Sequence, residues 1–416
     1  MGLNLDIQKQ FKNINLFNNR LYQYFSHLET PFYFYDMDLL HNSLKRLLNA
    51  AGKYDFIVHY AVKANANDRI LDTIKEYGLG ADCVSGNEVK KAVEKGIPPE
   101  KIVFAGVGKS DREITYAIDQ SIFSFNCESI EEIEIINEWG EKKQKKVPVS
   151  LRLNPDIDAI THKYLTTGLP ENKFGIPLQF LDKVIHRVKQ LSHIQLIGLH
   201  FHIGSQIREL EPYIQLCKKV NSIQELIYEK HGFYLEHINL GGGLGINYED
   251  PDKELIPDYE SFFEAVHKNL HRREGQKVHF ELGRSIVGQM GSLISKVLYI
   301  KKGVNKEFMI LDAGMTDLIR PALYGAQHKI ENISRPGARI KNYKYDVVGP
   351  VCESSDSFDD NVMLPKTKRG DLVAIRSTGA YGEVMVSQYI LRNKPKAIYS
   401  DELKDEWGNP LVLKKI

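Results

Sequence analysis

The sequence contains few cysteines, and their spacing is irregular. Only four occur in 416 residues, at Cys83, Cys127, Cys217 and Cys352, and no two of them form a Cys-x-x-Cys pair. A disulfide framework needs a denser set of cysteines and a zinc ribbon needs paired ones, so both kinds of protein are disfavoured. We therefore expect reduced thiols and a cytoplasmic location.

The chain also lacks an excess of charge of either sign and any long apolar run. Lys and Arg number 55 against 54 Asp and Glu, which gives a net charge of +1. This balance provides no basic surface for nucleic acid, and no apolar run approaches the length that spans a bilayer. Residues 1–9 lack the basic-then-apolar order of a signal peptide. We expect small-molecule partners, with no nucleic acid and no membrane.

What the sequence does contain is a long alternation of apolar, strand-like runs with amphipathic helical stretches. The alternation extends from about residue 55 to residue 283 and predicts a parallel sheet. The expected strands are eight segments: 56–62, 80–84, 101–104, 122–125, 147–153, 196–201, 237–240 and 278–281. Eight strands separated by helices within about 230 residues are typical of a (β/α)8 TIM barrel.

After Arg284 the pattern changes to strands and turns without intervening helices, as in residues 293–300 and 371–376. This predicts a separate C-terminal β domain. The strand-like segment Pro31–Tyr35 precedes the barrel and is expected to pair with that domain. The predicted division is therefore a barrel over residues 36–283 and a β domain formed by residues 1–35 and 284–416.

Unusual polar residues and glycines follow the predicted strands. Enzymes on this barrel build their sites at the C-terminal ends of the strands, and loops after strands seven and eight often hold a phosphate. The polar groups and glycines at these ends are Lys63, Asp82, Ser85, Arg152, Asn154, His200, His202, Gly241-Gly242-Gly243-Leu244-Gly245 and Glu281-Leu282-Gly283-Arg284. We expect them to gather on one rim.

Together these groups predict a site for pyridoxal 5′-phosphate. The Lys63 amine can bind the cofactor covalently, and the amides of the glycine run together with Ser205 can hold its phosphate. His202 can cover one face of the ring. Glu281 can keep the pyridine nitrogen protonated, so that the ring accepts electrons from a carbanion.

A metal-dependent hydrolase is the alternative for the same rim. His200 and His202 lie on one face of a strand, a spacing that metal-dependent barrel hydrolases also use. No carboxylate cluster accompanies the pair, whereas a phosphate loop does. We therefore expect no metal.

Several motifs together resemble the diaminopimelate decarboxylases, which are fold type III pyridoxal-phosphate decarboxylases related in fold to alanine racemase and ornithine decarboxylase. The motifs run in order over nearly the whole chain and are specific as a set. They are Tyr60-Ala61-Val62-Lys63-Ala64-Asn65, His202-Ile203-Gly204-Ser205-Gln206, Gly241-Gly242-Gly243-Leu244-Gly245, Arg320-Pro321-Ala322-Leu323-Tyr324 and Val351-Cys352-Glu353-Ser354-Ser355-Asp356.

The resemblance implies a Greek-key-like β domain and a homodimer whose two active sites are shared between subunits. It assigns catalysis to Lys63 and to Cys352 as proton donor. The cofactor-binding residues that it implies are Lys63, Asp82, His202, Ser205, Gly241, Gly242, Gly243, Glu281, Gly283, Arg284 and Tyr381. The substrate-binding residues that it implies are Arg284, Arg320, Tyr324, Glu353 and Tyr381.

The activity implied is decarboxylation of meso-2,6-diaminopimelate to L-lysine and CO2, the last step of lysine biosynthesis. The far end of this substrate is a second amino-acid centre, for which bidentate arginines suit the carboxylate. An ornithine, arginine or carboxynorspermidine decarboxylase is the nearest alternative, and an amino-acid racemase is a further one. A catalytically inactive regulatory homologue would be expected to lack Lys63 or Cys352.

Two positions depart from the family pattern. Leu282 stands where the family commonly has proline, which relaxes a backbone constraint without removing a functional side chain. Ile390 stands where the family usually has asparagine, so the role of that position is open.

Overall fold

The computed structural model describes most of the chain. The residues described are 17–157, 173–334, 343–404 and 411. They divide into two compact units. The barrel unit is Leu44–Gly245 with Asp258–Arg284, and the β unit is Met1–Ser43 with Ile246–Pro257 and Ser285–Ile416.

The barrel unit contains eight parallel strands that close on themselves. Their order around the barrel is β5-β4-β3-β2-β10-β9-β8-β6, and β6 pairs with β5 to complete the ring. The strands are β2 (Phe56–Ala61), β3 (Gly80–Cys83), β4 (Ile102–Phe104), β5 (Ser124–Cys127), β6 (Val147–Asn154), β8 (Ile194–His200), β9 (His237–Asn239) and β10 (Lys277–Leu282). Each strand begins and ends within two residues of its predicted bounds, and the predicted TIM barrel is confirmed.

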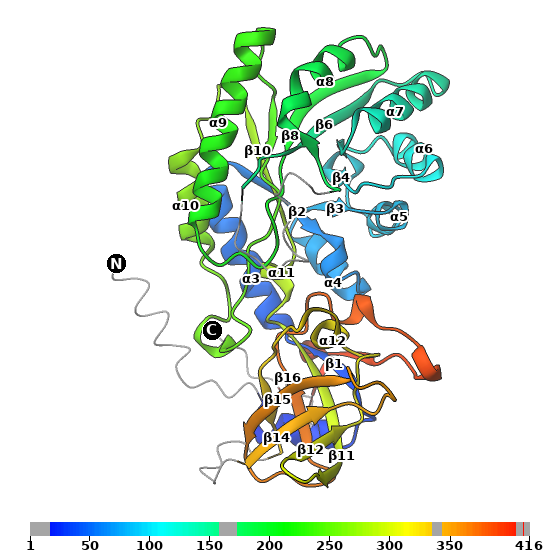
Figure 1. Cartoon of the computed structure of the whole chain (residues 1–416), viewed down its shortest axis with the longest axis vertical. Helices are drawn as coiled ribbons and strands as arrows, with labels where there is room; N and C mark the ends of the chain where they lie inside the picture. Colours follow the sequence, from blue (N-terminus) through cyan, green and yellow to red (C-terminus); the bar gives the residue numbers. More distant parts are fainter. Residues whose placement is uncertain (1–16, 158–172, 335–342, 405–410, 412–416) are drawn as a thin grey trace. The chain divides into compact units, whose positions relative to one another are not determined.

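Helices flank the barrel strands (Figure 1). They are α3 (Met37–Gly52), α4 (Asp68–Glu76), α5 (Gly86–Glu94), α6 (Asp111–Gln120), α7 (Ile130–Lys142), α8 (Leu181–Val188), α9 (Glu211–His231) and α10 (Tyr259–Asn269). The two-residue β7 (Ile176–Pro177) adds to β6. At the start of α6, Ser110 and Glu113 form a reciprocal capping box.

Three histidines form a hydrogen-bonded chain among the barrel strands. Lys101 O lies 3.0 Å from His59 Nδ1, His59 Nε2 lies 3.0 Å from His279 Nδ1, and His279 Nε2 lies 2.9 Å from His237 Nδ1. Because the Lys101 carbonyl can only accept, His59 Nδ1 carries the ring proton and His59 Nε2 accepts from His279 Nδ1. In the same way, His279 Nε2 accepts from His237 Nδ1. Burial lowers the pKa of all three imidazoles, so the chain is one of neutral rings.

The β unit is built on an eight-stranded, mostly antiparallel sheet. Six strands run in the order β13-β16-β11-β12-β14-β15, and β1 joins β11 to β17. The strands are β1 (Phe32–Tyr35), β11 (Gly291–Lys302), β12 (Glu307–Leu311), β13 (Ile330–Asn332), β14 (Tyr343–Val348), β15 (Ser357–Leu364), β16 (Leu372–Ile375) and β17 (Lys396–Tyr399). The N-terminal strand is antiparallel to β11, with Phe32 opposite Ile294.

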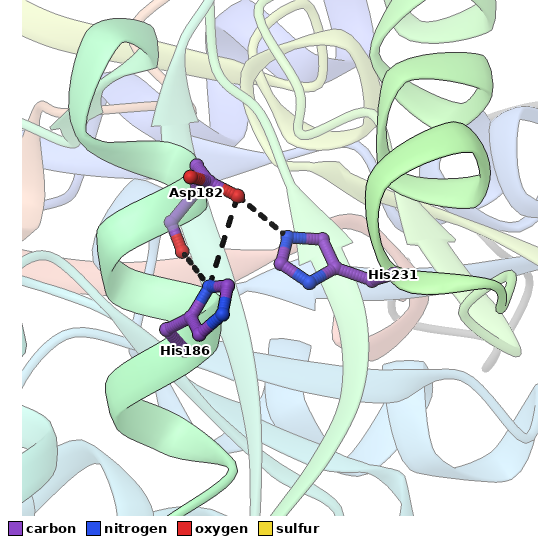
Figure 2. Close-up of side chains that lie close together, drawn as sticks. All are labelled: Asp182, His186 and His231. Carbon is purple, nitrogen blue, oxygen red and sulfur yellow. Dashed lines mark hydrogen bonds and ion pairs between the residues drawn. The ribbon is translucent and has the colours of Figure 1, made fainter.

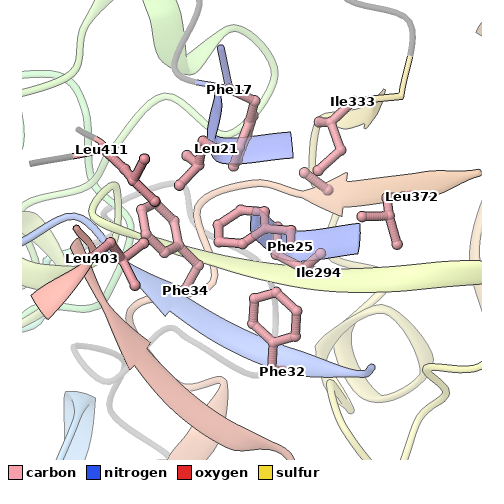
Figure 3. Close-up of a cluster of buried hydrophobic side chains, with 11 residues drawn as sticks. Phe17, Leu21, Phe25, Phe32, Phe34, Ile294, Ile333, Leu372, Leu403 and Leu411 are labelled. Carbon is pink, nitrogen blue, oxygen red and sulfur yellow. The ribbon is translucent and has the colours of Figure 1, made fainter. Parts of the chain in front are cut away.

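A buried core of aromatic and aliphatic side chains packs the N-terminal segment against this sheet (Figure 3). Phe25, from α2 (Asn19–Ser26), meets both Phe32 and Phe34 of β1 edge to face, with ring centroids 5.1 Å apart in each pair. The other buried members are Phe17, Leu21, Ile294, Ile333, Leu372, Ala374, Leu403 and Leu411. Segments from both ends of the sequence therefore share one apolar core.

The segment Ile246–Pro257 lies within the β unit, although it connects two elements of the barrel unit. Ion pairs explain this grouping, since Asp252 contacts both Lys329 and the buried Arg376. The sequence-based boundaries did not separate this segment, because its partners lie about 80 or more positions further along the chain.

Among the described residues, no helix combines the length and the apolar character that crossing a membrane requires.

Candidate active site

Lys63 and Asp82 meet at the C-terminal ends of two adjacent strands. Lys63 lies in the short helix η1 (Val62–Ala64), directly after β2, and its Nζ forms an ion pair with Asp82 of β3. The Lys63 side chain is 36% exposed, whereas the Asp82 carboxylate is completely buried. Burial and the nearby Glu281 raise the pKa of Asp82, and Lys63 opposes this shift. A buried carboxylate thus holds an accessible amine at the barrel rim.

Glu281 of β10 is held by donors from three other strands. His200 Nε2 lies 2.9 Å from its Oε2, while Asn126 Nδ2 and Asn239 Nδ2 donate to its Oε1 at 2.9 and 2.7 Å. Both oxygens therefore have fixed partners in the interior of the barrel. This arrangement orients the carboxylate and resists its rotation.

The same contacts determine the charge of Glu281. Burial by itself raises the pKa of this carboxyl, but His200, through its charge and its hydrogen bond, and Lys63 lower it well below its ordinary range overall. Glu281 is therefore an ionised carboxylate in a buried site, which can stabilise a nearby cation or N–H⁺ group.

The backbone of the glycine run after β9 packs closely against the backbone of neighbouring segments. A Cβ at Gly241 would clash with Phe201 O, one at Gly242 with Glu281 O, and one at Gly243 with Gly204 O. Gly241 and Gly243 also have φ values of 70° and 100°, which favour glycine. The glycines therefore let this loop pass close to the ends of β8 and β10.

Only some of the backbone N–H groups of this loop donate hydrogen bonds within the described part of the chain. Gly241 N–H donates to Asn239 Oδ1 at 2.9 Å, and Gly242 N–H donates to His202 Nδ1 at 3.3 Å. Within the described part of the chain, the N–H of Gly243 donates no hydrogen bond. A donor for an anion therefore remains on the loop.

Ser205 and Arg284 form a hydrogen-bonded pair at the barrel rim. Arg284 Nη2 donates to Ser205 Oγ at 2.9 Å, which joins the loop after β8 to the start of α11 (Arg284–Val287). The hydroxyl accepts from Arg284 and keeps its own proton to donate. A guanidinium and a hydroxyl side by side are suited to an anionic group.

His202 is a neutral imidazole at this rim. Burial, together with the positive charges of Arg152 and Lys63, lowers its pKa to about 3. His202 Nδ1 accepts from Gly242, and His200 is engaged with Glu281. Neither histidine belongs to a metal-ligating group of three among the described residues, so the hydrolase interpretation gains no support.

Sequence reasoning missed the supports of this site. Asn126 and Asn239 both donate to Glu281, and Glu128 Oε1 accepts from the predicted rim residue Arg152 at 2.5 Å. The available signal was a single asparagine that interrupts each apolar strand, near its C-terminal end. These positions were not singled out, because one polar residue in a strand is usually a minor packing feature.

The remaining predicted residues lie in the β unit. Arg320 and Tyr324 begin and end the short helix α12 (Arg320–Tyr324). Cys352 and Glu353 are exposed, and Glu353 Oε1 accepts from Tyr389 Oη at 2.8 Å. Tyr381 has a left-handed backbone with a φ of 55°.

Arg320 is buried and rigidly held within the β unit. Its Nη1 donates to Tyr248 Oη at 2.7 Å and lies 3.2 Å from His328 Nε2, and its guanidinium lies 4.7 Å from the Tyr248 ring centroid. Tyr248 and His328 are further residues that sequence reasoning missed. They pre-orient the arginine, which lowers the entropy that a bound carboxylate would have to offset.

The donor set of the barrel rim fits pyridoxal 5′-phosphate. The cofactor needs an accessible amine, an ionised carboxylate for its ring nitrogen and hydrogen-bond donors for its phosphate. Lys63, Glu281, and Ser205 with the glycine loop provide groups of these kinds within one unit.

Comparison with known families identifies the family of this chain. A family model described as pyridoxal-dependent decarboxylase, pyridoxal binding domain, matches residues 38–288, which is more than half of the chain. The chain belongs to the pyridoxal-dependent decarboxylase family. Membership in this family confirms pyridoxal phosphate as the cofactor.

Two relatives show which decarboxylases this chain is similar to. The diaminopimelate decarboxylase of Bacteroides thetaiotaomicron is 53% identical over 380 residues, which covers 91% of this chain and 97% of the relative. The diaminopimelate decarboxylase of Aquifex aeolicus is 39% identical over 387 residues, covering 93% and 89%. The predicted resemblance to diaminopimelate decarboxylases is therefore confirmed.

Solved structures of other decarboxylases agree with this result. Diaminopimelate decarboxylase from Helicobacter pylori, complexed with L-lysine, superposes with a TM-score of 0.84 at 40% identity and covers 91% of this chain and 93% of that one. A lysine/ornithine decarboxylase from Vibrio vulnificus has a TM-score of 0.79 at 22% identity and covers 91% and 97%. The second similarity supports the fold alone.

Proposed function

We propose that this decarboxylase converts meso-2,6-diaminopimelate to L-lysine and CO2. The observation that carries the proposal is the pairing, on one barrel rim, of an accessible Lys63 amine with a buried, ionised Glu281. The similarity to diaminopimelate decarboxylases over about nine-tenths of the chain supports the choice of substrate.

The barrel unit provides the cofactor-binding groups. When bound, pyridoxal 5′-phosphate supplies an electron sink for the carbanion that loss of CO2 leaves on the D-configured carbon. Lys63 would hold the cofactor through its amine, Asp82 would keep that amine in place, and Glu281 would keep the pyridine nitrogen protonated. Its low pKa supports this role, because only an ionised carboxylate can stabilise a protonated ring nitrogen.

The phosphate and the ring face are assigned to other residues. Ser205 and the glycine loop bind the phosphate, and Gly283, Arg284 and Tyr381 complete the cofactor site. The Arg284 to Ser205 hydrogen bond supports the assignment, since it already joins two of these groups. His202 would cover one face of the ring, and a neutral imidazole would do so without placing a second positive charge beside a protonated pyridine.

Cys352 is proposed to return the proton. Of the four cysteines it is the exposed one, whereas Cys83, Cys127 and Cys217 are buried. An exposed thiol can give its Sγ proton to the carbon that has lost CO2 and can then be reprotonated from water. Glu353, its neighbour, is proposed to contact the substrate's ammonium group.

Recognition of the distal amino-acid centre is assigned to Arg284, Arg320 and Tyr324, together with Tyr381. A carboxylate at the far end of the substrate calls for a fixed, bidentate cation. The contacts of Arg320 with Tyr248 and His328 support this role, because they hold the guanidinium in one orientation.

The assembly and the boundaries belong to the same proposal. We propose a homodimer in which Cys352 and Glu353 reach the partner's barrel, a cytoplasmic location, and a division into a barrel over residues 36–283 and a β domain over residues 1–35 and 284–416. The pairing of β1 with β11 supports placing the N-terminal strand with the β domain.

The experiment that tests the function is a substrate panel. Purified protein with pyridoxal 5′-phosphate is given meso-diaminopimelate, ornithine, arginine or carboxynorspermidine, and the amine products are separated. The proposal predicts L-lysine from the first substrate only. Release of putrescine or agmatine instead would assign the chain to the related basic amino-acid decarboxylases.

A further inference from the structure

Three metal-ligating side chains converge from two helices of the barrel unit. Asp182 and His186 are one turn apart on α8, and His231 is the last residue of α9 (Figure 2). One ligand atom from each residue lies within 4.8 Å of the others. None of the three takes part in the cofactor rim. Figure 2 shows both imidazoles directed toward the Asp182 carboxylate.

The two distances from the imidazoles to Asp182 are close to those of a small tetrahedral metal site. His231 Nε2 lies 3.1 Å from Asp182 Oδ1, and His186 Nδ1 lies 3.8 Å from the same oxygen. Nitrogen and oxygen ligands bind Zn²⁺ at about 2.0–2.1 Å, so neighbouring tetrahedral ligand atoms are roughly 3.3 Å apart. These two distances bracket this value, and small side-chain movements would complete the site.

His231 supplies an independent reason to expect a ligand. Its side chain is only 3% exposed, and its buried Nε2 has the Asp182 carboxylate at 3.1 Å but lacks the geometry of a regular hydrogen bond within the described part of the chain. A buried polar atom without a hydrogen bond is costly, so such atoms in folded proteins normally have a partner. A metal ion between Nε2 and the carboxylate would satisfy both groups.

The other two residues give the site an opening. The side chains of Asp182 and His186 are 48% and 69% exposed, so an ion can enter from solvent and keep a water molecule as its fourth ligand. One contact must be lost, because His186 Nδ1 lies 3.3 Å from the Asp182 carbonyl oxygen. This hydrogen bond is long and exposed, so replacing it costs little.

We propose that Asp182, His186 and His231 bind a divalent transition-metal ion, with Zn²⁺ as the best match. Two imidazoles and one carboxylate suit Zn²⁺ better than Mg²⁺ or Ca²⁺, which prefer oxygen ligands. Zn²⁺ has no electronic preference for a regular geometry and tolerates this arrangement. The bound ion ties α8 to the end of α9, the two helices on either side of β8 in the sequence. From the sequence we expect no metal, on the basis of His200 and His202 alone; this site uses other side chains.

The test measures Zn²⁺ binding to the full chain with its cofactor. Protein treated with a chelator and then desalted is titrated calorimetrically with Zn²⁺, and with Mg²⁺ for comparison. We expect one Zn²⁺ per chain and no Mg²⁺ binding. His186→Gln should weaken Zn²⁺ binding by at least about tenfold, since even the supports of metal ligands contribute 10- to 100-fold. His271→Gln, which changes an exposed histidine outside the cluster, should leave binding unchanged.

A second measurement guards against misfolding of variants. His186 and Asp182 are exposed, so His186→Gln and Asp182→Asn should fold even if His231→Gln does not. Zn²⁺ should raise the unfolding temperature of the wild type and of His271→Gln, because it binds only the folded state. It should not raise that of His186→Gln or Asp182→Asn. Equal Zn²⁺ affinity in the wild type and His186→Gln would overturn the proposal, whatever the decarboxylase activity.

Discussion

At the scale of single residues, Glu281 links the structure of the barrel to its chemistry. Its two oxygens receive hydrogen bonds from Asn126, Asn239 and His200, and its pKa is held below the ordinary range. The side chain is therefore charged and immobile before any ligand arrives. Such preorganisation is what a cofactor ring nitrogen requires of a counter-ion.

Replacing Glu281 by Gln should separate charge from binding. Glu281→Gln keeps the shape but removes the negative charge, so the pyridine nitrogen loses the group that keeps it protonated. We expect kcat for lysine formation to fall by about 100-fold or more, within the range of a single electrostatic contact. Bound pyridoxal phosphate, measured by its absorbance, should remain near one per chain. Glu264→Gln changes an exposed residue of α10 and is the matched control. An unchanged kcat in Glu281→Gln would contradict the role given to this carboxylate.

Ile390, one of the two departures from the family pattern, lies in an unfavourable backbone conformation. Its φ and ψ are 50° and 30°, the left-handed region, where a β-branched side chain is strained. Asparagine tolerates this region, which gives a physical reason for its usual presence in the family. Because Ile390 is half exposed, little packing is lost when it is replaced.

Ile390→Asn should therefore stabilise the protein. We expect the free energy of unfolding to rise by about 0.5–1 kcal/mol, part of the cost of a left-handed residue. Urea titration of purified protein measures the change. Val384→Asn, at an exposed valine that is not among the positive-φ residues, is the control and should bring no gain. A loss of stability in Ile390→Asn larger than in the control would show that the strain is not released.

At the scale of elements, the three-histidine chain makes the barrel sensitive to acid. His59 and His279 must be neutral, because a second ring proton on either would place two donors face to face. Burial lowers the three pKa values below the usual 6.5, so the unfolded chain takes up protons at a pH where the folded barrel does not. Stability is thus complete above about pH 6.5 and is lost as the pH falls below it.

This pH dependence can be measured by urea unfolding between pH 7 and 5.5. Each imidazole that stays neutral in the folded state contributes a slope of up to about 1.4 kcal/mol per pH unit. His279→Phe keeps a ring of similar shape in the middle of the chain and should flatten the slope, although the protein will be less stable throughout. His271→Gln should keep the wild-type slope. Equal slopes in His279→Phe and the wild type would show that the acid sensitivity arises elsewhere.

The elements themselves could be predicted, but their side-chain networks could not. The apolar runs predicted each barrel strand to within two residues, because burial on both faces leaves a strong local pattern. His59, His237 and His279 lie on three strands up to 220 positions apart, and only the closed order of strands brings them together. Lys63, Asp82 and Glu281 could be placed on one rim, because each lies at the C-terminal end of a predicted strand. The asparagines that support Glu281 could not be identified in this way.

At the scale of the whole molecule, the proposed site combines residues of two subunits, and this can be tested by mixing defective chains. Lys63→Ala lacks the cofactor amine and Cys352→Ala lacks the proton donor, so each homodimer should be inactive or nearly so. If the sites are shared, a mixed dimer contains one intact site. Random assortment should then restore about a quarter of the wild-type activity per chain.

The mixing experiment uses co-expression of the two variants with different tags, followed by lysine assay of the mixture. A mixture of Lys63→Ala with Lys63→Ala, Cys352→Ala double mutant is the control and should stay inactive. No recovery in dimers shown to contain both single variants would mean that Lys63 and Cys352 act within one subunit or not together. The sequence could not establish this point, since motifs do not record which chain they come from.

The most direct test of the central claim is the product formed from meso-diaminopimelate. With pyridoxal 5′-phosphate bound, the wild type should release L-lysine and CO2 in equal amounts, and Lys63→Ala should release neither and bind no cofactor covalently, as judged by mass spectrometry after borohydride reduction. Absence of lysine from a wild-type protein that carries its cofactor, or covalent cofactor in Lys63→Ala, would contradict the account.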